Sequence, residues 1–382
     1  MSNPSERSLA LKARLLTEGV AATPRALATL GTLHKEQNHG LFGWDFEDHV
    51  GRLLPDDFLL SDGTVVQFRG NSASPFRIEG EDGGLALYER EERLDSASLI
   101  PRPRYYSART HDGEPMVKVA QVGGEDCFFV CYQNYCSHFS KGSQCLFCNL
   151  VSTKETYNSV LTRKGVAQIA EVAAAAFSEG NCNHILLTGG CFSPKKEVGM
   201  VVEIVKAIGA ALKVDTVPGT ILPSPATNPD HLRAYRDSGI GAIGFSMEIW
   251  DEALFQAICP GKSSSTSHGA FVAAIEEAVG VFGAGNVYGV FVLGLEPRDT
   301  FLQGVKTLTG IGANVVPFVW SPNPGSRLQG HRPPGPAWYV DVMQEAAEVV
   351  AASGVPAGTA NHCYRCDGNS LLHDALRLKG IV

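Results

Sequence analysis

No apolar run in the sequence approaches the ~20 residues needed to span a bilayer, so we expect no membrane-spanning segment. No stretch rich in lysine and arginine is present that would follow a phosphate backbone, and the formal net charge is −8, so nucleic acid is not an expected partner. Residues 1–18 lack the continuous apolar core of a secretory signal. These absences predict a cytoplasmic protein whose partner is a small molecule.

What the chain does have is a large apolar content and many cysteines. Of its 382 residues, 44% are hydrophobic, which suffices for a large core. Ten are cysteines, and in a chain without a secretory signal clustered cysteines indicate metal ligands or redox groups. One group comprises five cysteines within 22 residues, and a separate pair lies near the C-terminus: Cys127, Cys131, Cys136, Cys145 and Cys148, then Cys363 and Cys366.

The pattern of apolar residues divides the chain into three parts. Residues 1–120 form a helical and then β-rich N-terminal extension, residues 121–330 a core barrel, and residues 331–382 a C-terminal extension. In the core, predicted strands alternate with predicted helices. The strands are Cys127–Tyr132, His184–Leu187, Leu212–Val217, Ala242–Met247, Val287–Leu293 and Asn314–Val319; the helices are Gly165–Phe177, Glu197–Ala211, Asp230–Ser238, Ser267–Phe282 and Thr300–Thr309.

This alternation predicts an α/β fold with parallel strands and right-handed crossovers. A partial (β/α)6 barrel of the TIM type fits it better than an open sheet, with an α+β extension before it and a second extension after it. In such folds the chemistry gathers at the C-terminal ends of the strands. Residues that follow each predicted strand are therefore the candidates for a functional site.

Three cysteines follow the first predicted strand of the barrel, namely Cys136, Cys145 and Cys148. Thiolates bind iron–sulfur clusters, and a loop can wrap around one cluster. Zinc is the alternative, with a fourth ligand from His138 or Cys131. Cys127 and Cys131 lie on the strand itself, where they are expected to be small buried hydrophobic residues.

The loop resembles the signature of the radical S-adenosylmethionine (SAM) superfamily, in which three cysteines end in Cys-x-aromatic-Cys. Here the first gap has eight residues instead of the commoner three, and Phe147 occupies the aromatic position. The resemblance implies a [4Fe–4S] cluster on Cys136, Cys145 and Cys148 whose fourth iron chelates SAM. It also implies that Phe147 packs near the adenine.

Further motifs follow in the order of that family. Gly189-Gly190 resembles its Gly-Gly motif, which binds the SAM amino group, although Cys191 replaces the usual glutamate; a plain turn between strand and loop is the alternative. Ser246 and Glu248, two apart on a strand, correspond to ribose ligands or to a solvated strand end. The resemblance places Gly294 and Pro317 at the adenine, with stretched spacing around Gly294.

Lys262 is either a ligand of the SAM carboxylate or a substrate anion, or a surface lysine. With Arg102–Tyr106, Thr110–Gly113, Lys118–Ala120 and Asp126, the segment Pro260–Lys262 resembles radical SAM proteins of nitrilase-containing (Nit1-type) gene clusters. That likeness covers about residues 40–330. It implies a biotin-synthase-like enzyme without an established substrate.

The C-terminal pair, Cys363 and Cys366, suits a metal, a second Fe–S cluster, a redox dithiol, or no special role. A pair is half of a ligand set, so Cys182, Cys191, Cys259 or His362 would have to complete an auxiliary site.

The resemblance as a whole implies reductive cleavage of SAM by an electron from flavodoxin or ferredoxin. The resulting 5′-deoxyadenosyl radical would abstract hydrogen from a small substrate. Three alternatives stay open: a sulfur-inserting enzyme with a second cluster, a zinc-dependent barrel hydrolase, and a non-catalytic Fe–S carrier.

Overall fold

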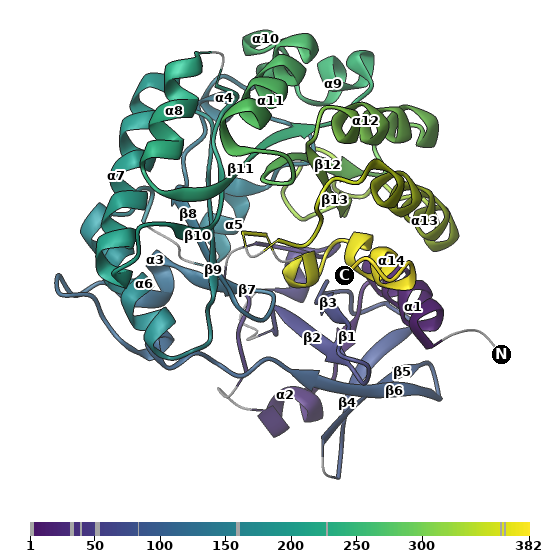
Figure 1. The fold of residues 1–382 in the computed structure, drawn as a ribbon. Coiled ribbons are helices and arrows are strands. Elements are labelled where there is room, and N and C mark those ends of the chain that lie inside the picture. Colours follow the sequence, from purple (N-terminus) through teal and green to yellow (C-terminus); the bar gives the residue numbers. More distant parts are fainter. Residues whose placement is uncertain are drawn as a thin grey trace.

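Two β-sheets organise the chain in a computed structural model, and helices cover the outer face of the larger sheet (Figure 1). The structure describes residues 4–30, 34–38, 40–49, 54–82, 84–157, 161–226, 228–359, 361–362 and 364–382. No helix among them is both long and apolar enough to cross a membrane.

The smaller sheet belongs to the N-terminal part of the chain, with strand order β1-β4-β5-β6-β2-β3. β1 pairs with β4 in parallel, and the other pairs are antiparallel. Burial alternates along β4, as expected for a sheet with one face on the core. The hairpins predicted before residue 120 are therefore present. The strands are β1 (Ala21–Ala22), β2 (Asp57–Leu60), β3 (Val65–Gln67), β4 (Phe76–Glu81), β5 (Gly84–Glu89) and β6 (Glu92–Leu99).

The larger sheet has the order β13-β12-β11-β10-β9-β8-β7. Its last six strands in sequence are parallel, and β7 pairs with β8 in the antiparallel sense. Side chains from β8, β9, β11, β12 and β13 line one common cavity, so the sheet curves around it and the predicted partial barrel is confirmed. The strands are β7 (Gln121–Gly123), β8 (Cys127–Gln133), β9 (His184–Gly189), β10 (Val217–Leu222), β11 (Ile240–Glu248), β12 (Val287–Leu293) and β13 (Asn314–Val319).

Amphipathic helices connect these strands, and each buries one apolar face against the sheet. The helices of the barrel are α6 (Val166–Ser178), α7 (Pro194–Leu212), α8 (Pro229–Asp237), α9 (Glu252–Ile258), α10 (Pro260–Ser265), α11 (His268–Phe282) and α12 (Arg298–Gly310). Five of them, α6, α7, α8, α11 and α12, have bounds within a few residues of the predicted ones, and α9 and α10 were not predicted. Shorter elements are α3 (Met116–Val119), α4 (Ser137–Ser140), α5 (Leu150–Thr156), η1 (Phe46–Asp48), η2 (Arg104–Ser107) and η3 (Tyr364–Cys366).

The prediction for the third barrel strand was wrong. Residues 212–217 were expected to form it, but α7 continues to Leu212, and Lys213 ends the helix in the left-handed conformation. The strand begins at Val217 and contains Pro218 and Gly219, two residues that argue against a strand when only propensity is considered. Gly219 (φ +143°) is needed because a Cβ there would lie 2.3 Å from the Ile185 carbonyl oxygen of β9. Close strand approach therefore overrides propensity.

The two ends of the chain pack together. α1 (Pro4–Glu18) lies beside α13 (Pro336–Ser353) and α14 (Leu372–Leu378), whereas α2 (Pro24–Leu30) packs on β4 (Figure 1). Lys12 Nζ and an Asp374 carboxylate oxygen form an ion pair of 2.8 Å, with both side chains 1% exposed. This buried pair joins the first helix to the last, and it brings the C-terminal segment to the barrel.

Candidate active site

The loop after β8 carries the three cysteines of the predicted cluster site. Cys136 precedes α4, and Cys145 and Cys148 lie in the turn that leads to α5. Burial raises the pKa of Cys148 to about 12, and negative charge on Cys145 and on Cys136 contributes to the same rise. The three sulfurs thus lie within reach of one another's charge. All three cysteines lie on this one loop after β8, and their role as cluster ligands stays a prediction.

Backbone hydrogen bonds hold this loop on both sides. Ser137 N donates to the Cys191 carbonyl (2.8 Å), Leu146 N donates to the Ile258 carbonyl (2.9 Å), and Gly261 N donates to the Ser143 carbonyl (3.0 Å). The loop is therefore anchored to the segment after β9 and to the junction of α9 and α10. These bonds hold the eight-residue gap between Cys136 and Cys145 in place, so the loop can be fixed although its gap is longer than the commoner three residues.

The glycine pair at the end of β9 serves the packing of this loop. A Cβ at Gly190 would lie 2.3 Å from the Tyr135 carbonyl oxygen and 2.8 Å from Cys136 Cβ. A Cβ at Gly189 would lie 2.6 Å from the Tyr132 ring. Protein atoms therefore fill the space beside each glycine, and the backbone contact of this pair with a SAM amino group stays a prediction.

Two further thiols lie beside the loop. A hydrogen bond with the Cys191 thiol lowers the pKa of Cys136 to about 5. Hydrogen bonding to Cys145, together with burial, raises the pKa of Cys259. Of the four residues that could complete a site with the C-terminal pair, Cys191 and Cys259 lie instead beside Cys136 and Cys145. Only the tertiary fold brings these separate segments together.

Glu248 and Lys262 form a buried ion pair next to the cysteines. Lys262 Nζ donates to Glu248 Oε1 and to the Ser246 carbonyl (2.8 Å), with the two side chains 13% and 11% exposed. Burial lowers the pKa of Lys262, but the charges of Glu248 and the neighbouring thiols outweigh burial, and the net pKa is raised. The interpretation of Lys262 as a surface lysine was therefore wrong.

The backbone at Glu248 is strained. Its φ is +72°, and the pairing of β11 with β12 shifts register between Ser246 and Glu248. Such a conformation costs on the order of 1–3 kcal/mol in a residue other than glycine and concentrates at functional sites. Both side chains line the same cavity, as their spacing of two predicted.

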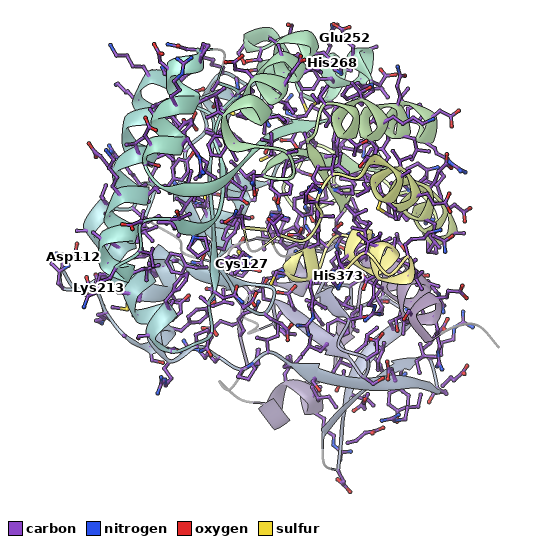
Figure 2. The ribbon with its side chains drawn as sticks, in the orientation of Figure 1. Asp112, Cys127, Lys213, Glu252, His268 and His373 are labelled. Carbon is purple, nitrogen blue, oxygen red and sulfur yellow. The ribbon has the colours of Figure 1, made fainter. Side chains whose placement is uncertain are left out.

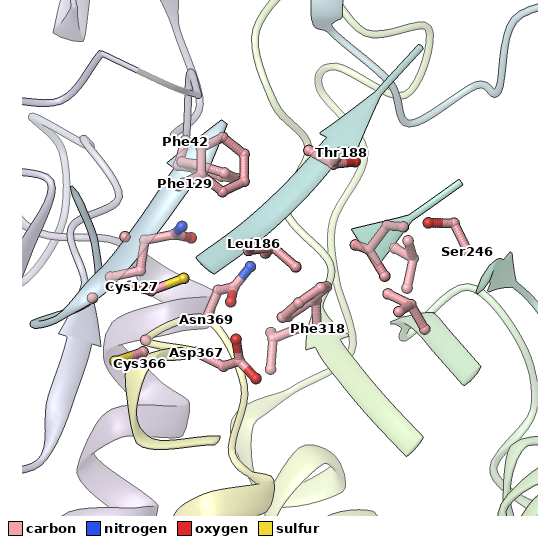
Figure 3. A pocket seen from close by; sticks show the side chains of 18 of the residues that line it. Phe42, Cys127, Phe129, Leu186, Thr188, Ser246, Phe318, Cys366, Asp367 and Asn369 are labelled. Carbon is pink, nitrogen blue, oxygen red and sulfur yellow. The ribbon is translucent and has the colours of Figure 1, made fainter. Parts of the chain in front are cut away.

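That cavity has a volume of about 350 Å³ and occupies the inside of the barrel. Phe147, Ser246 and Glu248 line it near the cysteine loop. Figure 3 shows Thr188 and Ser246 at one end of the cavity and Cys127, Cys366 and Asp367 at the other. The cavity therefore runs along the barrel from the C-terminal ends of its strands toward their N-terminal ends.

Gly294 and Pro317 do not line this cavity. Gly294 has φ +108°, and a Cβ there would lie 2.1 Å from the Tyr339 hydroxyl, so it serves a close packing contact. Pro317 is buried in β13, which is an edge strand and so tolerates a residue without an N–H donor. Phe318 and Val319, which follow Pro317 in β13, line the cavity instead.

The cavity wall after β13 carries polar atoms that the sequence analysis missed. Trp320 Nε1, Ser321 Oγ and Asn323 Oδ1 are buried, face the cavity, and have no hydrogen-bond partner among the described residues. Buried polar groups without a partner are costly, so these atoms are available to an ordered water or a bound polar molecule. Their position directly after the last barrel strand is the sequence feature that could have marked them as candidates for the site.

Arg69 completes this wall from the N-terminal extension. Its guanidinium is buried and donates to the carbonyls of Leu16 (2.7 Å) and Val319 (2.6 Å). Burial lowers its pKa to about 10. Arg69 thus connects the N-terminal extension to the barrel. No motif around Arg69 in the sequence pointed to this role.

The C-terminal pair is described only in part. Cys363 lies outside the residues that the structure describes. Cys366 Sγ donates to Asp126 Oδ1 at 2.7 Å, at the end of the barrel opposite the cysteine loop. Cys131 Sγ, the alternative fourth zinc ligand, donates to the Gln133 carbonyl (3.5 Å). Cys127 is buried, as expected, and lines the cavity.

No family model matches the sequence. The bacteriochlorophyllide c C-7(1)-hydroxylase of Chlorobaculum limnaeum is 24% identical over 362 residues, which cover 90% of this chain and 85% of that protein. Among solved structures, a radical SAM methyltransferase from Sphaerobacter thermophilus matches 75% of this chain and 77% of its own (18% identity, TM-score 0.42). The FeFe-hydrogenase maturase HydG from Carboxydothermus hydrogenoformans matches 61% of this chain, which spans about half (52%) of that protein (15% identity, TM-score 0.44). The chain resembles the radical SAM superfamily, as the cysteine motif predicts, whereas the likeness to Nit1-type proteins stays a prediction.

Proposed function

We propose that this chain is a radical SAM enzyme that abstracts hydrogen from a small organic substrate inside the barrel. One observation carries the proposal: the loop that holds the three cysteines follows β8 at the C-terminal ends of a parallel, barrel-forming sheet, and Phe147 of that loop lines a cavity of about 350 Å³. In barrels of this kind the reacting groups lie at that end.

The donor set fits an iron–sulfur cluster. Cys136, Cys145 and Cys148 supply three thiols, and the low pKa of Cys136 favours the thiolate that binds iron. When bound, a [4Fe–4S] cluster supplies the electron that cleaves SAM to methionine and a 5′-deoxyadenosyl radical. The loop contributes rigidity, because its hydrogen bonds to residues 191, 258 and 261 hold the three thiols in place.

The adjacent wall suits SAM. Phe147 offers an apolar ring, and Ser246 offers a hydroxyl to a ribose. Glu248 presents a carboxylate to the same part of the cavity, and Lys262 pairs with that carboxylate from outside the cavity wall. These residues would orient SAM so that its 5′ carbon faces the interior of the barrel.

The rest of the cavity suits a substrate. Leu186, Val290 and Phe318 make its wall largely apolar, and the unpartnered atoms of Trp320, Ser321 and Asn323 would orient polar groups. Enclosure shields a radical from water. A hydroxylase relative is in keeping with chemistry at a C–H bond. We further propose a cytoplasmic location and a flavodoxin or ferredoxin as electron donor.

The test is anaerobic purification, reconstitution with iron and sulfide, and measurement of 5′-deoxyadenosine after adding SAM and dithionite. We expect product from the wild-type chain and none from Cys136→Ala, Cys145→Ala or Cys148→Ala. Cys131→Ala is the matched control, since this thiol lies on β8 outside the loop and should leave product formation intact.

Three outcomes would contradict the proposal. Zinc without iron would favour a barrel hydrolase. Four iron atoms per chain without SAM cleavage would favour a non-catalytic carrier. Formation of 5′-deoxyadenosine by all three loop variants would show that these cysteines are not the cluster ligands. Cleavage of SAM with about eight iron atoms per chain would retain a radical SAM enzyme but favour the sulfur-inserting alternative with a second cluster.

A further inference from the structure

Three metal-binding side chains from three separate segments meet at the N-terminal end of the barrel. Asp126 lies in the turn between β7 and β8, His184 is the first residue of β9, and Cys366 ends η3 in the C-terminal segment. One ligand atom of each lies within 4.8 Å of the others. His184 and Cys366 line the cavity, and Figure 3 shows Cys366 at the end opposite Thr188 and Ser246.

The fold holds these three residues from outside. Asn183 donates from Nδ2 to Asp126 Oδ2 at 2.6 Å and from its backbone N to the Asp126 carbonyl at 3.1 Å. Asp126 Oδ1 lies 2.7 Å from Cys366 Sγ and 3.6 Å from His184 Nδ1. His184 Nδ1 donates to Asn183 Oδ1 at 2.6 Å, a bond that an ion bound through Nδ1 would replace. A hydrogen-bonded carboxylate of this kind is the usual surrounding of a metal ligand.

The C-terminal segment is clamped onto the turn that carries Asp126. Arg365 and Glu125 form an ion pair of 2.5 Å. Gly124 has φ +55° and allows the Cys366 backbone to approach closely. A Cβ added at Gly124 would lie 2.4 Å from the Cys366 carbonyl oxygen. The position of Cys366 beside Asp126 is thus imposed by packing on both sides.

The spacing suits a four-coordinate ion. Zinc binds thiolate at ~2.3 Å, imidazole at ~2.0–2.1 Å and carboxylate at ~2.0–2.2 Å, so tetrahedral ligand atoms lie about 3.4–3.6 Å apart. The separation of His184 Nδ1 and Asp126 Oδ1, 3.6 Å, meets this value. The Cys366 and Asp126 atoms, now joined by a shared proton at 2.7 Å, need to part by about 0.9 Å when an ion replaces that proton.

We infer that Asp126, His184 and Cys366 form a site for one divalent transition-metal ion such as Zn²⁺, with its fourth position open to the cavity. The fourth position of the ion would face the cavity because His184 and Cys366 both line it. An oxygen or nitrogen atom of the substrate fits that position. Binding of the substrate at the fourth position rests on the proposed function, because the ion would then anchor the substrate at the end of the barrel away from the radical. The metal site itself does not rest on the proposed function.

The test uses Co²⁺ as the probe on the full chain, in a background of Cys136→Ala, Cys145→Ala and Cys148→Ala that removes the proposed cluster ligands. We expect one Co²⁺ per chain, a thiolate-to-cobalt charge-transfer band, and displacement by Zn²⁺. Cys366→Ser should abolish the band, and Asn183→Ala should weaken binding about 10–100-fold, as loss of a residue that orients a ligand does.

Two variants guard against misfolding. Cys366→His should keep the bound ion but lose the charge-transfer band, and Cys182→Ser, at a nearby buried thiol outside the group, should keep both. Absence of stoichiometric Co²⁺, or a band that survives in Cys366→Ser, would overturn the site. So would a wild-type chain whose C-terminal end binds iron and sulfide as a second cluster. Release of 5′-deoxyadenosine is read separately, so failure of this site and failure of the proposed function are distinguishable.

Discussion

Lys262 Nζ and Glu248 Oε1 form an ion pair where β11 ends, and the Lys262 ammonium also caps the Ser246 carbonyl. The pair lies between the cysteine loop and the cavity, with neither side chain more than 13% exposed. It therefore joins the two parts of the candidate site, and it is the most direct place to test how that site is held.

Lys262→Met should destabilise the protein by about 3–5 kcal/mol, because it leaves the Glu248 carboxylate buried without its cation. The double variant Lys262→Met/Glu248→Gln should lose less, since no buried charge is left unpaired. Chemical denaturation of the metal-free chain measures both. Arg298→Gln is the control, as its ion pair with Glu345 is about two-fifths exposed and should contribute little. An equal loss of stability in Lys262→Met and in Arg298→Gln would contradict this prediction.

Gly190→Ala should displace the cysteine loop, because the new Cβ would lie 2.3 Å from the Tyr135 carbonyl oxygen. We expect a folded chain that retains much less iron after reconstitution, measured as iron per chain beside the far-ultraviolet circular dichroism spectrum. Gly199→Ala in α7 is the control, since among the described residues no atom outside its own stretch of helix backbone lies within 4 Å of the added Cβ. That change should stabilise the helix by up to ~1 kcal/mol. Full iron content in Gly190→Ala would refute the packing role.

Ser321→Ala should leave stability unchanged or raise it by up to about 1 kcal/mol, because its buried hydroxyl has no partner among the described residues. The matched change is Ser238→Ala, which removes a buried hydrogen bond of 2.6 Å to the Tyr235 carbonyl and should cost about 1 kcal/mol. Urea denaturation of the ligand-free protein compares the two. A larger loss for Ser321 than for Ser238 would show that the hydroxyl already has a structural partner.

The contact of His111 with Glu171 should make stability depend on pH. A hydrogen bond with Glu171 raises the pKa of His111, and the same bond lowers the pKa of Glu171. The raised pKa of His111 gives stability that is full below its ordinary value of 6.5 and lost as pH rises through the folded value. The lowered pKa of Glu171 gives stability that is lost as pH falls below 4.5.

His111→Gln should therefore lower the melting temperature more at about pH 5.5 than at about pH 8. Its neighbour Asp112 lies at the periphery of the molecule (Figure 2), so the cysteine site should be unaffected. Glu171→Gln should reproduce the pH dependence from the other partner. A His111 effect that is equal at both pH values would contradict the assigned contact.

Most of the barrel was predictable because its information is local. Alternating apolar runs and amphipathic helices predict parallel strands, and five of the six predicted barrel strands overlap the observed ones closely. The third failed because Pro218 and Gly219 depress strand propensity, while the contact of β9 with β10, which requires a glycine, is not visible in the sequence. The proposed division at residues 120 and 330 stays a prediction.

The sequence by itself determined the cysteine loop and the spacing of Ser246 and Glu248, since both are patterns within one segment. Only the tertiary structure decided that Lys262 pairs with Glu248, that Cys191 and Cys259 lie beside the loop cysteines, and that Cys366 meets Asp126 and His184. The physical reason is distance along the chain. These contacts join segments from separate crossovers and from the C-terminus, and their geometry is set by how helices and strands pack, which no local pattern encodes.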